Sequence, residues 1–141
     1  MKRYLITAAL ALTTTAALAQ TTPGDQFLLN WDLNQDGTAT LDELREMRGN
    51  VFFSFDANED GYLNAEEYVL FDEARANDVA NYEASQRTQM QKVADGMSLP
   101  VADLDSDGRV SEAEFLSGAE TWFAALDQNG DGGITLEDFT R

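Results

Sequence analysis

The 141-residue chain carries a formal net charge of −17 and contains neither histidine nor cysteine. Its length suits one domain, or at most two small halves. A chain this acidic repels nucleic acids and anionic lipid surfaces, which argues against nucleic-acid binding and against membrane insertion of the mature chain. The missing cysteines exclude disulfide bonds.

Residues 1–19 are typical of a secretory signal peptide. Lys2 and Arg3 precede an uncharged run that ends in Ala-Leu-Ala at Ala19, the small-x-small pattern of a cleavage site. A membrane anchor is the alternative, but the run is short for a span and rich in alanine and threonine. We therefore expect cleavage near Ala19, a periplasmic or secreted location, and a mature domain over residues 20–141. Cleavage would change the net charge from −17 to −19, because the removed segment has two basic and no acidic side chains.

Four windows of twelve residues concentrate the acidic side chains, and we call them loops 1 to 4: residues 32–43, 56–67, 103–114 and 127–138.

Loop 3 shows the chemistry of these windows most clearly. Asp103, Asp105 and Asp107 occupy alternate positions, Gly108 follows them, and Glu114 closes the window. Alternate carboxylates in a tight turn can face one point, the glycine permits the backbone reversal, and the closing glutamate offers two oxygens from the far side. Such a cage of hard oxygen ligands suits Ca²⁺. A single window could equally be a solvated acidic turn between helices, but four in one chain argue against that alternative.

The four windows resemble the calcium-binding loop of the EF-hand family. The resemblance implies an all-α fold of helix–loop–helix repeats and places Ca²⁺ ligands at positions 1, 3, 5, 7, 9 and 12, with position 7 acting through its backbone carbonyl. In loop 1 these are Asp32, Asn34, Asp36, Thr38, Thr40 and Glu43, and in loop 2 they are Asp56, Asn58, Asp60, Tyr62, Asn64 and Glu67. In loop 3 they are Asp103, Asp105, Asp107, Arg109, Ser111 and Glu114, and in loop 4 they are Asp127, Asn129, Asp131, Gly133, Thr135 and Asp138.

Two loops differ from the others in their ligands. Loop 3 has four acidic ligands, so its charge predicts the tightest Ca²⁺ site. Loop 4 closes with Asp138 instead of glutamate, and the shorter side chain predicts weaker Ca²⁺ binding and a relative preference for Mg²⁺. In loop 1, Ala39 replaces the branched aliphatic residue that usually pairs with a partner loop, which predicts weaker packing there.

The spacing of the loops predicts an unusual pairing. Loops 1 and 2 start 24 residues apart, as do loops 3 and 4, so only residues 44–55 separate the first two. Apolar residues in this segment recur at helical intervals, and residues 115–126 repeat the pattern. We therefore predict one continuous helix shared by the two loops of each half, which keeps those loops roughly 20 Å apart. The loops should then pair across the halves, with one half antiparallel to the other.

We call residues 68–102 the connector. Its residue pattern predicts two helices with a break near Asn77 and Asp78, where Asp78 caps the second helix. Gly96 should end that helix, and Ser98 should restart the chain, so that loop 3 lacks a full entering helix. Before loop 1, we expect Asp25 to cap a short helix.

The large aromatic side chains are expected to form the core; the alternative is that some line a groove exposed on Ca²⁺ binding. They are Trp31, Phe52, Phe55, Phe71, Phe115, Trp122, Phe123 and Phe139.

These patterns predict a calcium-binding protein that acts as a periplasmic or secreted buffer or as a Ca²⁺-stabilised module. The alternative is a Ca²⁺-dependent switch that binds a protein partner through an exposed apolar surface. No partner can be named from the sequence. We expect no enzymatic activity, because no base stands beside a nucleophile and the acidic clusters are accounted for as ligands. Without metal, repulsion among these carboxylates should leave the fold loose, and bound metal should act as its staple.

Overall fold

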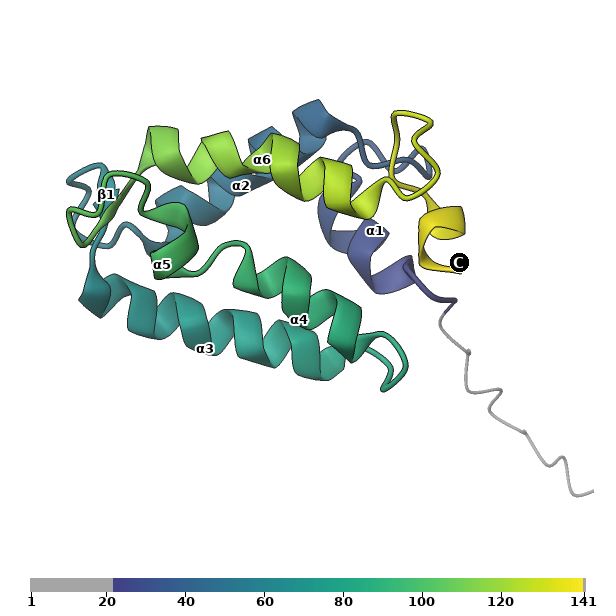
Figure 1. The fold of residues 1–141 in the computed structure, drawn as a ribbon, viewed down its shortest axis with the longest axis horizontal. Helices are drawn as coiled ribbons and strands as arrows, with labels where there is room; N and C mark the ends of the chain where they lie inside the picture. Colours follow the sequence, from purple (N-terminus) through teal and green to yellow (C-terminus); the bar gives the residue numbers. More distant parts are fainter. Residues whose placement is uncertain (1–21, 141) are drawn as a thin grey trace, which may run out of the picture.

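The computed structural model describes residues 22–140, and over this range the fold is helical (Figure 1). Its elements are α1 (Asp25–Trp31), α2 (Leu41–Phe55), β1 (Tyr62–Leu63), α3 (Ala65–Asn81), α4 (Arg87–Asp95), α5 (Leu99–Ala102), β2 (Val110–Ser111), α6 (Glu112–Leu126) and the 3₁₀ helix η1 (Leu136–Phe139). The all-α prediction is confirmed. The predicted signal peptide lies outside the described residues.

Each half contains one central helix that runs without a break from one loop to the next. α2 and α6 have 15 residues each. Thr40 caps α2 and Ser111 caps α6, each in a reciprocal capping box with the glutamate three residues later. Asp56 is the C-cap of α2 and Asp127 is the C-cap of α6, and these are the first residues of loops 2 and 4. The predicted shared helices are therefore confirmed.

The loops pair across the halves, as the spacing predicted. β1 of loop 2 pairs antiparallel with β2 of loop 3, and Leu63 lies opposite Val110. Loop 1 pairs with loop 4 through a bridge in which the N–H of Ala39 donates to Ile134 at 2.9 Å and the N–H of Ile134 donates back at 3.0 Å. Ala39 and Ile134 are fully buried. The bridge thus forms with alanine in place of a branched residue.

α2 and α6 lie side by side and run in opposite directions, which brings one loop of each half to either end of the molecule (Figure 1). Phe52, near the C-terminal end of α2, and Phe115, near the N-terminal end of α6, meet toward the end that carries loops 2 and 3, with ring centroids 5.8 Å apart. Both side chains are fully buried.

A second aromatic cluster lies at the end that carries loops 1 and 4. The rings of Trp31 and Trp122 meet edge-on with centroids 4.5 Å apart, and Phe27 packs against Phe139 at 5.4 Å. The predicted core is confirmed, with Phe55 and Phe123 only partly buried and the other six residues buried.

Asp25 does not cap α1, contrary to prediction. Gly24 occupies the N-cap with φ +93°, and Asp25 is the first helical residue, where its carboxylate accepts the N–H of Thr22 at 2.6 Å. A Cβ at Gly24 would come within 2.4 Å of the Phe139 ring. The left-handed backbone and this contact together require glycine at the cap.

The predicted break at Asn77 and Asp78 is also wrong. α3 continues through both residues to Asn81, and Gln86 occupies the N-cap of α4 without a capping side-chain hydrogen bond. The turn is set instead by Arg87, whose guanidinium donates to the carbonyls of Tyr82 at 2.9 Å and Ala80 at 3.1 Å.

The rest of the connector follows prediction. Gly96 is the C-cap of α4, and Ser98 is the N-cap of α5, a helix of only four residues before loop 3. Two long-range hydrogen bonds hold this segment to the core. The Tyr68 hydroxyl donates to Met97 O at 3.0 Å, and Trp122 Nε1 donates to Val93 O at 2.9 Å. Within residues 22–140, no helix is both long and apolar enough to cross a membrane.

Arg48 is a buried cation at the crossing of α2 and α6. Its side chain is 1% exposed, and Nε and Nη2 both donate to the carbonyl of Phe115, at 2.9 and 2.6 Å. Nη1 is buried without a hydrogen-bond partner, and the guanidinium carbon lies 4.7 Å from the Phe115 ring centroid. A Cβ at Gly118 would lie 2.8 Å from Nη2, so the glycine makes room for the guanidinium. Burial lowers the pKa of Arg48 to about 10.

Arg48→Ala should lower the free energy of unfolding by about 2–4 kcal/mol, because it leaves a cavity between the two central helices. Arg48→Met keeps most of the side-chain volume without burying a charge, so it should stay within about 1 kcal/mol of wild type. Urea unfolding followed by circular dichroism measures both. Equal losses in the two variants would contradict this account, because the guanidinium itself would then be essential.

Candidate metal centre

The four loops share one hydrogen-bonded framework around the aspartate at position 1. Each of these carboxylates accepts the backbone N–H groups of positions 5 and 6, one on each oxygen. The eight distances lie between 2.8 and 3.2 Å, with Asp32, Asp56, Asp103 and Asp127 as the acceptors. The loop backbone therefore folds around the first carboxylate in the same way in all four loops.

The closing carboxylate ties the two ends of each loop together. One oxygen of Glu114 accepts the N–H of Ser111 at 2.8 Å, and the other accepts the N–H of Leu104 at 3.0 Å. Glu43 and Glu67 make the corresponding contacts in loops 1 and 2. These bonds fix the carboxylate at the start of the following helix, where the helix dipole also favours negative charge.

Loop 4 closes in the same way with a shorter side chain. Asp138 accepts the N–H of Thr135 at 2.8 Å on one oxygen and the N–H of Gln128 at 2.9 Å on the other. It is 1% exposed, and it lies in the short 3₁₀ helix η1 where loops 1 to 3 lead into α-helices. Asp138 thus makes the same two end contacts as the glutamates do.

Two positions of each loop have a left-handed backbone. Position 6 is glycine throughout, with φ between +80° and +92°. Position 4 has φ between +57° and +71° and is held by Gln35, Glu59, Ser106 and Gly130. A side chain in this conformation costs about 1 kcal/mol, so loops 1 to 3 carry a local strain that Gly130 removes from loop 4.

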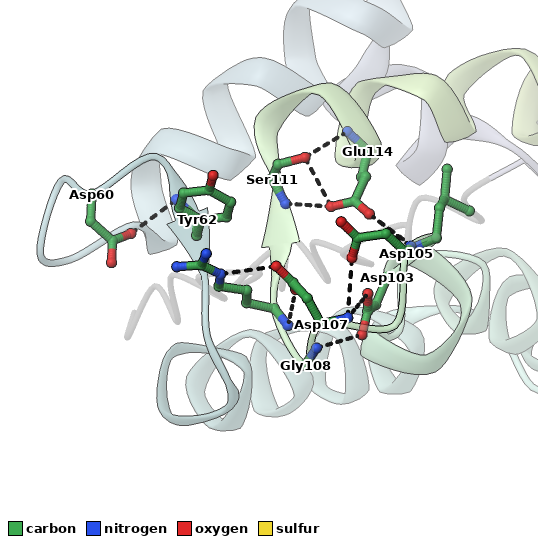
Figure 2. A network of polar contacts seen from close by, with 10 residues as sticks. Asp60, Tyr62, Asp103, Asp105, Asp107, Gly108, Ser111 and Glu114 are labelled. Atoms are coloured by element: carbon green, nitrogen blue, oxygen red, sulfur yellow. Dashed lines mark hydrogen bonds and ion pairs between the residues drawn. The ribbon is translucent and has the colours of Figure 1, made fainter.

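Loop 3 brings its carboxylates closest together (Figure 2). Asp103, Asp105 and Glu114 each place an oxygen within 4.8 Å of the others, and among the described residues this is the one acidic group so tightly gathered. Position 3 is aspartate here and asparagine in the other loops, which accounts for the difference.

Neighbouring groups affect the charges in this cluster in opposite ways. Hydrogen bonds from the backbone and hydroxyl of Ser111 hold the pKa of Glu114 below its usual value. The backbone N–H of Asp107 lowers the pKa of Asp105, but desolvation and three neighbouring carboxylates outweigh it and raise the pKa overall. A cation placed among these oxygens would relieve their repulsion.

The side chains at positions 1, 3, 5, 9 and 12 are carboxylates, amides and hydroxyls, so the donor set fits a hard cation such as Ca²⁺. The carboxylates at positions 1 and 12 of every loop belong to the hydrogen-bonded framework. The position-7 residues lie in or next to the segments through which two loops pair. The assignment of individual ligand atoms stays a prediction.

Sequence reasoning missed two features of the site. The first is the capping box that joins positions 9 and 12, whose signal is the Ser/Thr-x-x-Glu pattern at Thr40 and Ser111. The second is the contact of Arg109 with Tyr62 across the paired loops, with 3.8 Å between the guanidinium carbon and the ring centroid. It depends on the register of β1 and β2 and has no signal within one loop.

Comparisons with known proteins agree with this geometry. A family described as EF hand matches residues 51–71, 101–117 and 119–141, which contain loops 2, 3 and 4. Loop 1 lies outside the matched segments but has the same hydrogen-bonded framework. Over 133 residues the chain is 26% identical to calcium-binding protein LPS1-alpha of Lytechinus pictus, a match that covers 81% of this chain and 39% of that protein. The chain thus spans about two-fifths of the length of this relative.

Three segments of the chain match the EF-hand family, all four loops share one framework, and one helix joins the two loops of each half: in these segments and in its fold, the chain is similar to the helix–loop–helix repeats of EF-hand proteins.

Proposed function

We propose that the chain binds Ca²⁺ through up to four loops and serves as a periplasmic or secreted calcium buffer or Ca²⁺-stabilised module. The observation that carries the proposal is the loop 3 cluster, in which Asp103, Asp105 and Glu114 hold carboxylate oxygens within 4.8 Å of one another. The same backbone framework recurs in the other loops. The segments that match the EF-hand family and the similarity to a calcium-binding protein also support calcium binding.

The chain contributes a preformed arrangement of negative charge. Backbone N–H groups hold the carboxylates at positions 1 and 12, so these groups keep their places although they repel one another. Bound Ca²⁺ would supply the positive charge that this arrangement lacks. Because ion binding removes repulsion, it should also stabilise the fold.

The continuous central helices support the buffer role. In a switch, Ca²⁺ changes the angle between the two helices that flank a loop. Here one helix flanks two loops, so α2 joins loop 1 to loop 2 and α6 joins loop 3 to loop 4. Rotation at one loop therefore disturbs the other, which favours sites that fill without a large change in the angle between the helices.

We infer that loop 4 is the site where Mg²⁺ competes best, because Asp138 is one methylene shorter than the closing glutamates. We also infer that the chain has no catalytic activity. Carboxylates are its main titratable groups, and those of the four loops have a role as ligands.

Calorimetric titration tests the calcium function. Wild type should show three or four binding events and gain helix by circular dichroism as Ca²⁺ is added. Glu114→Gln should weaken one site by at least about tenfold, because it removes a ligand charge from loop 3. Millimolar Mg²⁺ should weaken the loop 4 event most.

Glu112→Gln is the matched control, since it removes one charge from the same helix turn outside the ligand set. Its affinities should stay within about threefold of wild type, as expected for an unligated charge near the site. A wild-type chain that produces no heat and no change in helix content would contradict the proposed function. Equal effects of the two substitutions would contradict the ligand role of Glu114.

The proposed location has a separate test. When the chain is expressed in a bacterium with residues 1–19 in place, the protein recovered from the periplasm should have the mass of a chain that begins at Gln20. Recovery of the uncleaved chain from the cytoplasm would contradict the location and leave the calcium proposal untouched.

A second candidate function is a Ca²⁺-dependent switch that binds a protein partner. An apolar cavity of about 190 Å³ favours it. Its walls come from five helices and include six aromatic side chains: Phe27, Trp31, Phe55, Phe71, Tyr82 and Trp122. Both halves contribute, so a change in their packing would change the cavity.

Binding of a fluorescent apolar dye separates the two candidates. The buffer proposal predicts no increase in dye fluorescence when Ca²⁺ is added to the folded chain. A switch predicts an increase, because it must expose different apolar surface in its two states. Ala74→Trp places a large side chain in the cavity wall and should remove that increase. An increase that Ala74→Trp abolishes would replace the buffer proposal with the switch.

A further inference from the structure

Arg109 of loop 3 contacts Tyr62 of loop 2 as well as Asp107 of its own loop. Its Nε donates to Asp107 Oδ2 at 3.1 Å, and its guanidinium carbon lies 3.8 Å from the centre of the Tyr62 ring. The side chain is 47% exposed, so it sits at the surface of the loop pair and not in the core.

The register of the strands produces this contact. Tyr62 lies opposite Ser111, two residues after Arg109, so Arg109 and Tyr62 are diagonal neighbours on one face of the pair. Long side chains reach aromatic rings across such a diagonal. A guanidinium over a phenol face is attracted by its negative charge density, which fixes the position of the cation.

Two acidic residues that interact with this cation are predicted ligands from different loops. Asp107 at position 5 of loop 3 is engaged on both oxygens, since Oδ1 accepts the backbone N–H of Arg109 at 3.0 Å and Oδ2 accepts its Nε. Asp60 at position 5 of loop 2 accepts the N–H of Tyr62 at 3.0 Å and adds its negative charge from the other side.

The other loop pair has no such cation. Its position-7 residues are Thr38 and Gly133, and they lie so close that a Cβ on the glycine would come within 2.4 Å of Thr38 Cγ2. Among the described residues, Asp36 Oδ2 in loop 1 accepts no hydrogen bond and Asp131 Oδ2 in loop 4 accepts one from a neutral amide, Asn129 Nδ2, at 3.0 Å, whereas Asp107 Oδ2 accepts the charged Arg109. The paired loops 2 and 3 thus hold a cation against their carboxylates, and within residues 22–140 the paired loops 1 and 4 do not.

We propose that Arg109 is an internal counter-cation that lowers the Ca²⁺ affinity of the loop 2 and loop 3 pair and holds the two loops together when Ca²⁺ is scarce. The proposal rests on the proposed calcium function and adds the residue that sets affinity at one end of the molecule. Two effects act together. The guanidinium repels an incoming cation, and it occupies an oxygen of Asp107. The same charge offsets the repulsion between the acidic loops before the ion arrives.

This opposing charge reduces the advantage that ligand charge predicts for loop 3. Loop 3 has the most acidic ligands, but its position-7 residue carries the opposing charge. The affinity of loop 3 is therefore lower than its four carboxylates alone imply. Ca²⁺ binding and the Arg109 contact compete for the same negative charge, so the pair exchanges one counter-ion for another.

Arg109→Gln and Arg109→Lys in the purified chain test the proposal by Ca²⁺ calorimetry at low and high salt. Gln removes the charge, so the loop 2 and loop 3 sites should bind Ca²⁺ about two- to tenfold more tightly at low salt, and the gain should shrink at high salt because the charge is screened. Lys keeps the charge and should stay within about twofold of wild type, since long-range repulsion depends on the charge and less on the shape. The Ca²⁺-free melting temperature of Arg109→Gln should fall at low salt.

A purely structural role predicts a different pattern. If Arg109 only packs against Tyr62, Gln and Lys should both lose the planar contact and weaken binding alike, whatever the salt concentration. Equal or weaker binding in Arg109→Gln would overturn the counter-cation proposal while leaving the calcium function intact. A wild-type chain that binds no Ca²⁺ would overturn both. Tyr62→Leu, which removes the ring and keeps the charge, should lower the Ca²⁺-free melting temperature without the gain in affinity.

Discussion

The antiparallel packing of α2 against α6 determines where every loop lies. Each helix has 15 residues, about 22 Å in length, and carries a loop at either end. A loop therefore cannot reach the other loop of its own half. Because the helices run in opposite directions, loop 2 meets loop 3 at one end and loop 1 meets loop 4 at the other. Phe52, Phe115 and the buried guanidinium of Arg48 fill the contact that keeps the helices in this arrangement.

The loops then concentrate negative charge at the two ends of the molecule. This arrangement is held by backbone N–H groups, which bond to the first and last carboxylate of each loop. The peptide groups fix the positions of the carboxylates but leave most of their charge unneutralised. We therefore expect folding and cation binding to be coupled, since the same carboxylates that organise the loop also repel one another across it.

Much of the architecture could be predicted from the sequence because it depends on spacing. The 24-residue interval between loops, filled by one apolar stripe, leaves room for a single helix, and cross-half pairing follows from its length. The helix break in the connector could not be placed in this way. Asn77 and Asp78 are weak helix formers, yet α3 continues past them, and the turn forms where Arg87 bonds to Tyr82 and Ala80. Tertiary contacts overrode a local preference there.

The framework of the site could be predicted in part from the sequence. The glycine at position 6 and the closing carboxylates are visible as a pattern, and the structure shows why they are needed, through the left-handed backbone and the bonds to both ends of the loop. The contact of Arg109 with Tyr62 could not be predicted from the sequence. Its partner lies 47 positions away along the chain, and only the register of β1 with β2 makes them neighbours.

Cross-half pairing also gives the molecule an approximate twofold axis. A rotation that carries α2 onto α6 carries loop 1 onto loop 3 and loop 4 onto loop 2, so one loop pair replaces the other. Each half on its own would expose two unpaired loop edges, and these edges are complementary to those of an identical half. Two copies of a single half would therefore satisfy each other in an isologous dimer. The present chain has the organisation of such a dimer with its two halves joined in one polypeptide, and α3 and α4 form the connection.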